Sequence, residues 1–295
     1  MSQADAVAFV DRPAVARRFA RAAADYAQHD FLVREIDRRM LERLDYVRLQ
    51  PQRILDLGCS RGGSFPGLLE RYPQARLLGV DIARPMLAAA RPARSGWRRW
   101  LGLDGAAPDC LQAAAESLPL AGASVSLVWS NLLLHWLDHP LPALAEAHRV
   151  LEVGGLLMFS TLGPDTLQEL RAAFADGYAH TQRFTDMHDL GDMLVESGYA
   201  DPVMDMEVLT LTYDDIDSLF AELRGAGSAC AMHARRHCLT GKGRLLAVRE
   251  AYERMRSAGR LPASFEVIYG HAWKAAPKKT ADGRAIIRFE RGARS

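Results

Sequence analysis

The chain is predicted to adopt a doubly wound α/β fold on a mostly parallel sheet, with helices ahead of the sheet and a helical cap over it. Apolar runs of strand length alternate with helical segments from Arg53 to Thr161, which is the pattern of consecutive β–α–β units. A glycine-rich turn, RILDLGCSRGG at 53–63, separates the first strand from its helix. The next apolar run, LLGVD at 77–81, ends in an acid.

The composition limits the class of protein. A chain of 295 residues with 49% hydrophobic residues, 25% charged residues and a net charge of +1 is an ordinary globular protein, so its overall charge predicts no nucleic-acid partner. No apolar run reaches the length of a membrane span, and Asp5 and Asp11 interrupt the N-terminal region, so neither membrane insertion nor secretion is expected. Four cysteines are too few for a disulfide scaffold, and we expect a cytoplasmic location.

Residues 1–50 are expected to form an N-terminal helical extension. From Ala14 to about Leu49, apolar side chains recur at helical spacing with alanine-rich helix formers between them, which predicts one or two helices. Pro51 marks the boundary with the sheet. The apolar positions of this extension are Phe19, Tyr26, Phe31, Ile36, Met40 and Leu44.

The domain predicted for residues 51–274 begins with the alternating elements. Its first strands are predicted at Arg53–Leu57, Arg76–Asp81, Ser124–Asn131 and Leu156–Thr161, and its first helices at Phe65–Arg71, Met86–Arg91 and Leu141–Leu151. Gly154 and Gly155 are expected to end the last of these helices and to open the next strand.

After Thr161 the alternation changes. Helices are predicted at Asp165–Phe174, Met187–Ser197, Asp214–Arg224 and Leu245–Arg256, and strands at Pro202–Tyr213 and Ser264–Lys274. Two late strands separated by helices predict a sheet completed by a distant hairpin, with cap helices over its carboxyl edge. Residues 275–295, which are rich in Lys, Arg and Gly, are expected to be a flexible basic tail.

The turn after the first strand is typical of a nucleotide-cofactor site. Gly58 and Gly62 allow the backbone to turn sharply and to approach a ligand closely, and the next helix would point its free N–H groups at that ligand. Asp81 follows about twenty residues later, where an acid can accept the hydroxyls of a ribose. Dinucleotide-binding folds and methyltransferases share this pattern, so it leaves the cofactor open.

Later segments narrow the choice. The chain resembles class I S-adenosylmethionine-dependent methyltransferases in the order and spacing of ESLPL (116–120), VSLVWSN (125–131), the helix over 144–151 and GGLLMFS (154–160). The resemblance implies a Rossmann-like sheet of seven strands with S-adenosylmethionine as the cofactor. The candidate cofactor-binding residues are Asp56, Gly58, Cys59, Gly62, Asp81, Ile82, Met86, Glu116, Ser117 and Asn131.

More specific motifs resemble the malonyl-acyl-carrier-protein O-methyltransferases of biotin synthesis. They are RAAADY (21–26), FSTLGPDTL (159–167), RFTDMHDL (183–190), LTG (239–241) and YGHAW (269–273), and the similarity runs from about Pro13 to Trp273. The resemblance implies methyl transfer from S-adenosylmethionine to the free carboxylate of malonyl-acyl-carrier protein, an early step of biotin synthesis. It implies an acidic protein partner and no metal.

Two positions depart from that family. Ser60 stands where the turn usually has glycine, and a serine can be accommodated there if its φ angle is ordinary. Ala114 stands where the family usually has an acid, two places before Glu116. The missing acid would remove one hydrogen bond to the adenine amino group, worth about 0.5–1.5 kcal/mol.

A carboxylate acceptor with an ordinary pKa of about 4 is already ionised at neutral pH and needs no general base. Catalysis would then depend on positioning and on the exclusion of water. The candidate catalytic residues are Tyr26 from the N-terminal helices and Asn131, His135 and Trp136 beyond the fourth strand, because ligands bind outside the carboxyl ends of parallel strands. The alternative for Tyr26, His135 and Trp136 is simple packing in the core or lid.

Two clusters of polar residues complete the prediction. Cys230, His233, His237 and Cys238 have a spacing that suggests zinc, but the adjacent His237 and Cys238 cannot easily face one ion from a helix, so no metal site is predicted. A basic patch that would steer an acidic carrier protein is predicted from Arg235, Arg236, Lys242 and Arg244, together with Arg91, Arg94, Arg98 and Arg99. A solvated face is the alternative. Trp97 and Trp100 among the arginines match no recognised RNA-binding module.

Two other functions stay open from the sequence. One is an arginine hydroxylase that resembles the complex I assembly factors. The other is a non-catalytic binding protein on a methyltransferase fold, which Ser60 and Ala114 would favour if they abolished the cofactor site.

Overall fold

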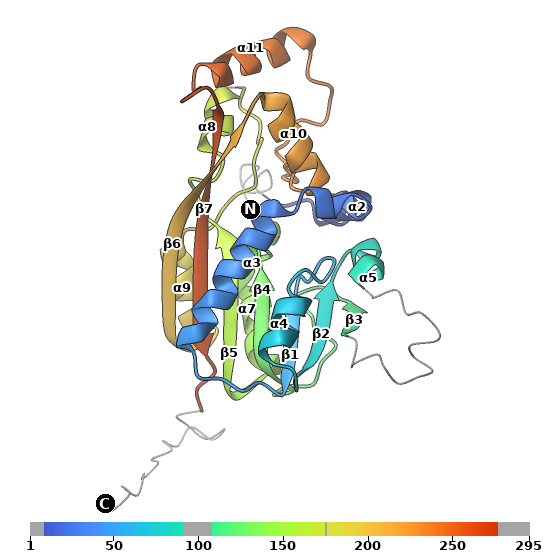
Figure 1. The fold of residues 1–295 in the computed structure, drawn as a ribbon, viewed down its shortest axis with the longest axis vertical. Coiled ribbons are helices and arrows are strands. Elements are labelled where there is room, and N and C mark those ends of the chain that lie inside the picture. The colour runs from blue at the N-terminus through green and yellow to red at the C-terminus, as the bar shows by residue number, and fades with distance from the viewer. Residues whose placement is uncertain (1–8, 91–107, 175, 277–295) are drawn as a thin grey trace, which may run out of the picture.

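The computed structural model describes residues 9–90, 108–174 and 176–276, which build a seven-stranded sheet flanked by helices (Figure 1). Along the sheet the strand order is β3-β2-β1-β4-β5-β7-β6, and only β7 runs antiparallel to its neighbours. The predicted doubly wound, mostly parallel sheet is therefore confirmed. Its strands are β1 (Arg53–Leu57), β2 (Arg76–Asp81), β3 (Asp109–Gln112), β4 (Val125–Asn131), β5 (Leu151–Leu162), β6 (Ala200–Tyr213) and β7 (Leu261–Trp273).

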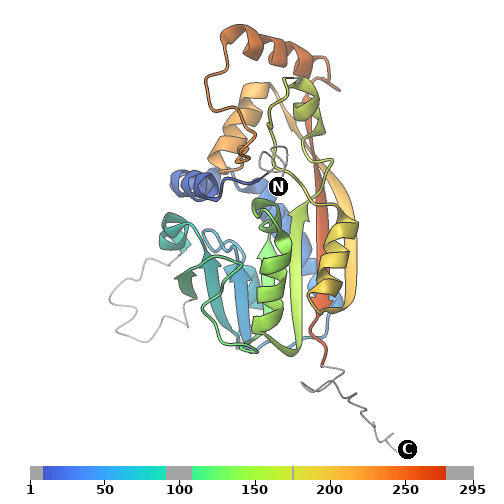
Figure 2. The same cartoon turned by 180° about the vertical axis from the view of Figure 1, so that it is seen from behind.

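Side-chain alternation along the central strands divides the core into two layers. Ile54 of β1 is in register with Leu127 of β4, and both pack on the face covered by α3 (Phe31–Arg43) and α4 (Phe65–Arg71). Leu55 points to the other face, which α7 (Pro140–Val150) and α9 (Met187–Glu196) cover (Figure 2). The carboxyl ends of β1, β2 and β4 are left for the site.

The N-terminal helices take two different places. Helix α2 (Arg12–Ala22) begins at Asp11, whose carboxylate accepts a hydrogen bond from the N–H of Ala14 at 2.9 Å. The 3-10 turns η1 (Tyr26–Gln28) and η2 (Leu44–Tyr46) precede and follow α3. Because η1 redirects the chain, α3 packs on the sheet while α2 lies over its carboxyl edge beside α5 (Arg84–Ala90) (Figure 1).

The cap lies beyond the carboxyl ends of the parallel strands, at the top of Figure 1. Its helices are α8 (Gln168–Ala173), α10 (Ile216–Gly225) and α11 (Lys242–Glu253). Strands β6 and β7 carry the cap, because their pairing continues to Tyr213 and Leu261, past the end of β5. The cap is thus connected to the sheet by continuous strands and roofs the site.

The structure differs from the predicted elements in a few places. Strand β3 was not predicted, because its four residues are only partly buried and form no apolar run. Strand β5 begins at Leu151, so Gly154 and Gly155 lie inside it instead of opening it. Helix α8 begins at Gln168 and not at Asp165, because residues 163–167 form a turn bonded to β7.

Some predictions fall outside the described residues. These are the arginines at 91, 94, 98 and 99, the tryptophans at 97 and 100, and nearly all of the predicted tail. Within the ranges that the structure describes, no helix has both the length and the apolar character needed to cross a bilayer.

Candidate functional site

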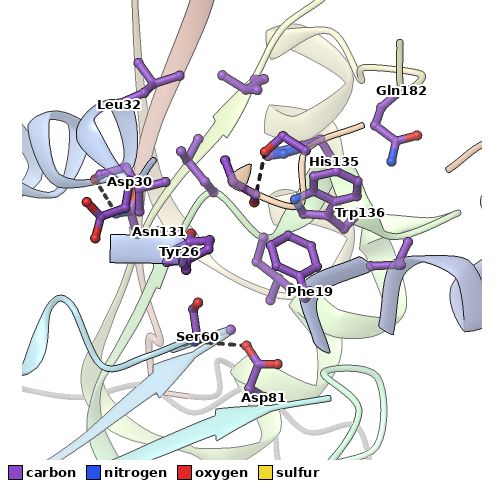
Figure 3. A pocket seen from close by; sticks show the side chains of 18 of the residues that line it. Phe19, Tyr26, Asp30, Leu32, Ser60, Asp81, Asn131, His135, Trp136 and Gln182 are labelled. Atoms are coloured by element: carbon purple, nitrogen blue, oxygen red, sulfur yellow. Dashed lines mark hydrogen bonds between the residues drawn. The ribbon is translucent and has the colours of Figure 1, made fainter. Parts of the chain in front are cut away.

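A pocket opens between the carboxyl ends of β1, β2 and β4 and the cap. Its floor is the glycine loop over residues 58–64, and its walls come from α2, η1, the start of α3 and the segments 131–137 and 180–184. Apolar side chains make up most of the lining, and the polar ones come from several elements (Figure 3). Two of these elements are the glycine loop and the segment beneath the cap that holds Gln182.

The glycine loop has a strained backbone held by hydrogen bonds. The N–H groups of Gly58 and Cys59 both donate to the carbonyl of Val80, at 2.8 and 3.0 Å, which ties the loop to β2. Gly58 and Gly62 have φ angles of +81° and +73°, which favour glycine. A Cβ on Gly62 would also lie 2.5 Å from the ring of Phe65.

Ser60 does not meet the condition of an ordinary φ angle. Its φ is +49°, in the left-handed region, which costs a non-glycine residue about 1–2 kcal/mol. The conformation is held from outside the loop, because the N–H of Ser60 donates to Oδ2 of Asp81 at 2.9 Å. The serine is therefore tolerated through a tertiary contact.

Asp81 organises the floor of the pocket. Besides the bond from Ser60, its Oδ1 accepts a hydrogen bond from the N–H of Ala83 at 2.7 Å, so one carboxylate joins the loop to the segment before α5. Burial raises the pKa of Asp81 in spite of these backbone donors. The acid that sequence analysis assigned to a ribose thus already has a structural role.

Asp56 and Asp37 place two acidic side chains inside the pocket wall. Asp56 is 2% exposed, and its Oδ2 has no hydrogen-bond partner among the described residues. Burial, reinforced by the neighbouring charges of Asp37 and Asp81, raises the pKa of Asp56 well above its usual range. Asp37 accepts hydrogen bonds from Ser64 Oγ at 2.6 Å and Trp129 Nε1 at 3.1 Å. This wall suits a ligand that carries positive charge.

Sequence analysis missed Asp37. The residue lies on α3 next to Ile36, on the helix face that packs against the sheet. An acidic residue at a position of this buried face is unusual, and that was the signal by which the sequence could have revealed it. Burial raises the pKa of Asp37, with Ser64 and Trp129 opposing the shift. An acid at such a position needs partners, and only the fold brings those partners to it.

The wall beyond β3 is apolar, and it includes Ala114, the position where the family usually has an acid. Ala113, Ala114 and Ala115 line it, and Glu116 at its end pairs with Arg12 of α2 at 3.1 Å. This pair connects the N-terminal helix to the opposite side of the pocket.

The predicted cofactor residues divide into two groups by position. The pocket is lined by Asp56, Gly58, Cys59, Asp81, Ile82, Glu116 and Asn131. Gly62, Met86 and Ser117 are not among the lining residues. Met86 is fully buried and its sulfur receives a contact from Ser60 Oγ at 3.4 Å, so it supports the loop from below.

The four predicted catalytic residues all line this pocket (Figure 3). Burial raises the pKa of Tyr26 to about 12 and lowers the pKa of His135 to about 3, so both side chains are neutral near pH 7. Trp136 packs edge-on against Phe19 with ring centroids 5.1 Å apart. His135 Nδ1 lies 3.3 Å from Thr161 Oγ1.

Asn131 has its polar atoms engaged within the protein. Its Nδ2 donates to the carbonyl of Val33 at 3.0 Å, and its Oδ1 accepts from Ser160 Oγ at 2.7 Å. The side chain therefore ties α3, β4 and β5 together at the edge of the pocket.

Two of the candidate zinc residues have other partners. Cys230 Sγ donates to the carbonyl of Thr181 at 3.1 Å, and His237 Nε2 lies 3.0 Å from the carbonyl of His233. Among the residues that can be described, no group of three or more His, Cys, Asp or Glu is arranged to hold a metal ion.

The predicted basic patch is less uniform than its sequence suggests. Arg235 pairs with Asp11 at 2.7 Å, with side chains only 16% and 14% exposed, so it holds α2 against the cap. Arg236 lies 5.4 Å from the ring of Tyr178, and Arg244 pairs with Asp176 at 3.2 Å. Lys242 is exposed at the start of α11.

Comparison with known proteins extends these observations. A family model described as "Methyltransferase domain" matches residues 55–159. The chain is 47% identical over 281 residues to a protein of Gallionella capsiferriformans named malonyl-[acyl-carrier protein] O-methyltransferase, covering 95% of this chain and 96% of the relative. A protein of the same name from Laribacter hongkongensis is 46% identical over 286 residues, again covering 95% and 96%.

Solved structures share the fold at low sequence identity. The YcgJ protein of Bacillus subtilis is 16% identical with a TM-score of 0.56, covering 81% of this chain and all of that one. The [4+2]-cyclase SpnF is 20% identical with a TM-score of 0.50, covering 81% of each chain. Because a cyclase shares the fold, the fold alone does not specify the chemistry.

Proposed function

The chain belongs to the family of malonyl-[acyl-carrier protein] O-methyltransferases, and from that premise we propose how its pocket divides between cofactor and acceptor. The protein is an S-adenosylmethionine-dependent carboxyl O-methyltransferase, which methylates the free carboxylate of malonyl-acyl-carrier protein in biotin synthesis. Neither the hydroxylase nor the non-catalytic alternative is favoured by these relatives. The observation that carries the division of the pocket is the acidic wall of Asp56, Asp37 and Asp81 beside the glycine loop.

The cofactor half of the pocket is proposed to be the glycine loop with this acidic wall. S-adenosylmethionine carries an ammonium and a sulfonium, and the buried unpartnered Oδ2 of Asp56 fits such a cation. Gly58 and Cys59 would follow the ligand with their backbone, and Asp81 would accept its ribose hydroxyls. When bound, the cofactor supplies an electrophilic methyl group on a positively charged sulfur.

The acceptor half is proposed to lie beneath the cap, between Tyr26, His135 and Trp136. The malonyl carboxylate is ionised at neutral pH, so these residues need to orient it and exclude water without removing a proton. The neutral state of His135, whose pKa falls to about 3 through burial, agrees with that role. Asn131 is proposed to hold the edge of the pocket in shape through Val33 and Ser160.

An acidic carrier protein is proposed to dock beside the cap. Arg236, Lys242 and Arg244 follow the pocket-lining segment that ends at Cys230, and they would act mainly on encounter and orientation. Arg235 is excluded from this surface, because it is committed to Asp11. A cytoplasmic location is also proposed, since Cys59 is a buried free thiol in the glycine loop, which suits a reducing compartment.

The test uses methyl-labelled S-adenosylmethionine with malonyl-acyl-carrier protein. We expect label in a methyl ester on the malonyl group, and none with butyryl-acyl-carrier protein, which has no free carboxylate. Labelling of both carrier proteins, or of neither, would contradict the proposed acceptor. A parallel reaction with malonyl-CoA measures how much the carrier protein itself contributes to recognition.

A further inference from the structure

Beneath the cap, Gln182 presents a buried hydrogen-bond donor that the protein leaves unused. The side chain is 7% exposed and lines the pocket with His135 and Trp136 (Figure 3). Its Oε1 accepts a hydrogen bond from the N–H of Ala231 at 3.2 Å, whereas its Nε2 has no partner among the described residues. Because buried donors are nearly always paired, an unpaired one in a pocket wall indicates a ligand.

The orientation of this amide is determined by its neighbours. The N–H of Ala231 can only donate, so the oxygen of Gln182 must face it and the NH₂ group must point away. The segment itself is anchored, because the N–H of Ala179 donates to the carbonyl of Ala234 at 3.1 Å and Cys230 Sγ donates to the carbonyl of Thr181. The free donor is therefore held in place before any ligand arrives.

Several other polar groups in the lining have partners within the protein. Thr166 Oγ1 exchanges hydrogen bonds with the backbone of Glu266, and His180 pairs with Asp176 at 2.7 Å. Two of the lining arginines are also paired, Arg12 with Glu116 and Arg34 with Asp30. An anion entering beneath the cap would thus meet uncharged donors first.

We propose that Gln182 Nε2 donates to the carboxylate of the malonyl group and selects acceptors that carry one. The inference rests on the proposed function and adds the residue that recognises the acceptor. The chemistry favours a neutral donor, since the carboxylate loses its charge as the ester forms. A cation would therefore stabilise the reactant more than the transition state and slow the reaction. A neutral amide also orients the carboxylate, but it stabilises the charged reactant less than a cation does and so slows the reaction less.

The test compares two ligands of one shape on wild-type protein and on Gln182→Met. Malonyl-pantetheine and isovaleryl-pantetheine differ in that two methyl groups replace the two carboxylate oxygens. Binding is measured by calorimetry with S-adenosylhomocysteine present. We expect Gln182→Met to weaken binding of malonyl-pantetheine roughly 10- to 150-fold, the range for a hydrogen bond to a charged group, and to leave binding of isovaleryl-pantetheine within about twofold.

A second variant distinguishes recognition from packing. Gln182→Glu keeps the shape and the acceptor for Ala231, but sets a carboxylate against the malonyl group. Its affinity for malonyl-pantetheine should fall further and recover as the pH is lowered and the new acid is protonated. Equal losses for both ligands, or no loss of malonyl affinity in either variant, would overturn the proposal.

Arg61 is the rival, because it lines the pocket from the glycine loop. If Arg61→Met abolishes the preference for malonyl-pantetheine and Gln182→Met does not, a cation recognises the carboxylate and the proposal is wrong. Failure of the proposed function looks different, because wild-type protein would then form no methyl ester on malonyl-acyl-carrier protein. Thermal unfolding and affinity for S-adenosylhomocysteine, both expected to stay near wild type in the two Gln182 variants, show that these variants are folded.

Discussion

Replacing Asp81 by asparagine should lower both the stability of the apoprotein and its affinity for the cofactor. The carboxylate serves two backbone donors, Ser60 at 2.9 Å and Ala83 at 2.7 Å. Asparagine has one acceptor oxygen, so one of these bonds is lost and its NH₂ group faces a donor. A hydrogen bond to a charged group is worth about 1.5–3 kcal/mol, which is the upper limit of the expected fall in unfolding free energy. The substitution also removes a buried carboxylate, and this will reduce that fall, because burial raises the pKa of Asp81.

The proposed bond from a ribose hydroxyl to Asp81 is of the same type. Its loss should weaken cofactor binding by about 1.5–3 kcal/mol, or roughly 10- to 150-fold. Calorimetric titration with S-adenosylmethionine and with S-adenosylhomocysteine measures the loss of affinity, and urea unfolding without ligand measures the fall in unfolding free energy. Asp109→Asn is the matched control, because Asp109 is an exposed acid on neighbouring β3 and should change neither quantity. If Asp81→Asn lowers stability while affinity stays at the wild-type value, Asp81 only anchors the loop and the ribose assignment is wrong.

Three further predictions follow from the charges of the site. Asp56→Asn should raise the melting temperature of the apoprotein at neutral pH and weaken S-adenosylmethionine binding. Because the pKa of Asp56 is raised in the folded protein, wild-type stability falls as the pH rises above about 4. If the melting temperature of the variant fell with pH as steeply as that of the wild type, this reasoning would be wrong. The methylation rate should be flat between about pH 6 and 8. The free energy of unfolding should fall below pH 6.5, because His135 in the folded protein, with a pKa of about 3, does not take up a proton that the unfolded chain binds. In urea unfolding measured at several pH values, His135→Gln should reduce that loss. Neutralising Lys242 and Arg244 should raise the KM for malonyl-acyl-carrier protein severalfold at low salt and leave the KM for malonyl-pantetheine unchanged. Arg235→Ala should lower the melting temperature instead. An equal effect on both substrates would place Lys242 and Arg244 in the pocket.

Several features of the fold and site could be predicted because they are written locally in the chain. The alternation of apolar runs and helical spacing identified most strands, and the glycines at 58 and 62 predicted a turn that the structure shows with positive φ at both. Asp81 was placed correctly at the end of β2, since an acid that ends a buried strand must lie at the carboxyl edge of the sheet. Strand β3 was missed because its partly buried residues lack the apolar run on which strand prediction depends.

The charge of the cofactor wall could not be deduced in the same way. Asp37 meets Trp129 across 92 residues of sequence, and nothing in the helix around Asp37 specifies that meeting. The left-handed backbone of Ser60 depends on Asp81, which lies 21 residues further on. In both cases a group's conformation or pKa is determined by a partner that only packing supplies.

The acceptor side of the pocket depends still more on tertiary structure. Gln182 lies in an irregular segment with no periodicity to orient its side chain, and its free Nε2 follows from the N–H that Ala231 directs at its oxygen. By itself, the sequence determined the order of the elements and the place of the glycine turn, because local propensity and hydrophobic pattern act over a few residues. Only the tertiary structure decided which polar atoms remain unpaired in the pocket, because hydrogen-bond satisfaction is settled between segments far apart in the chain.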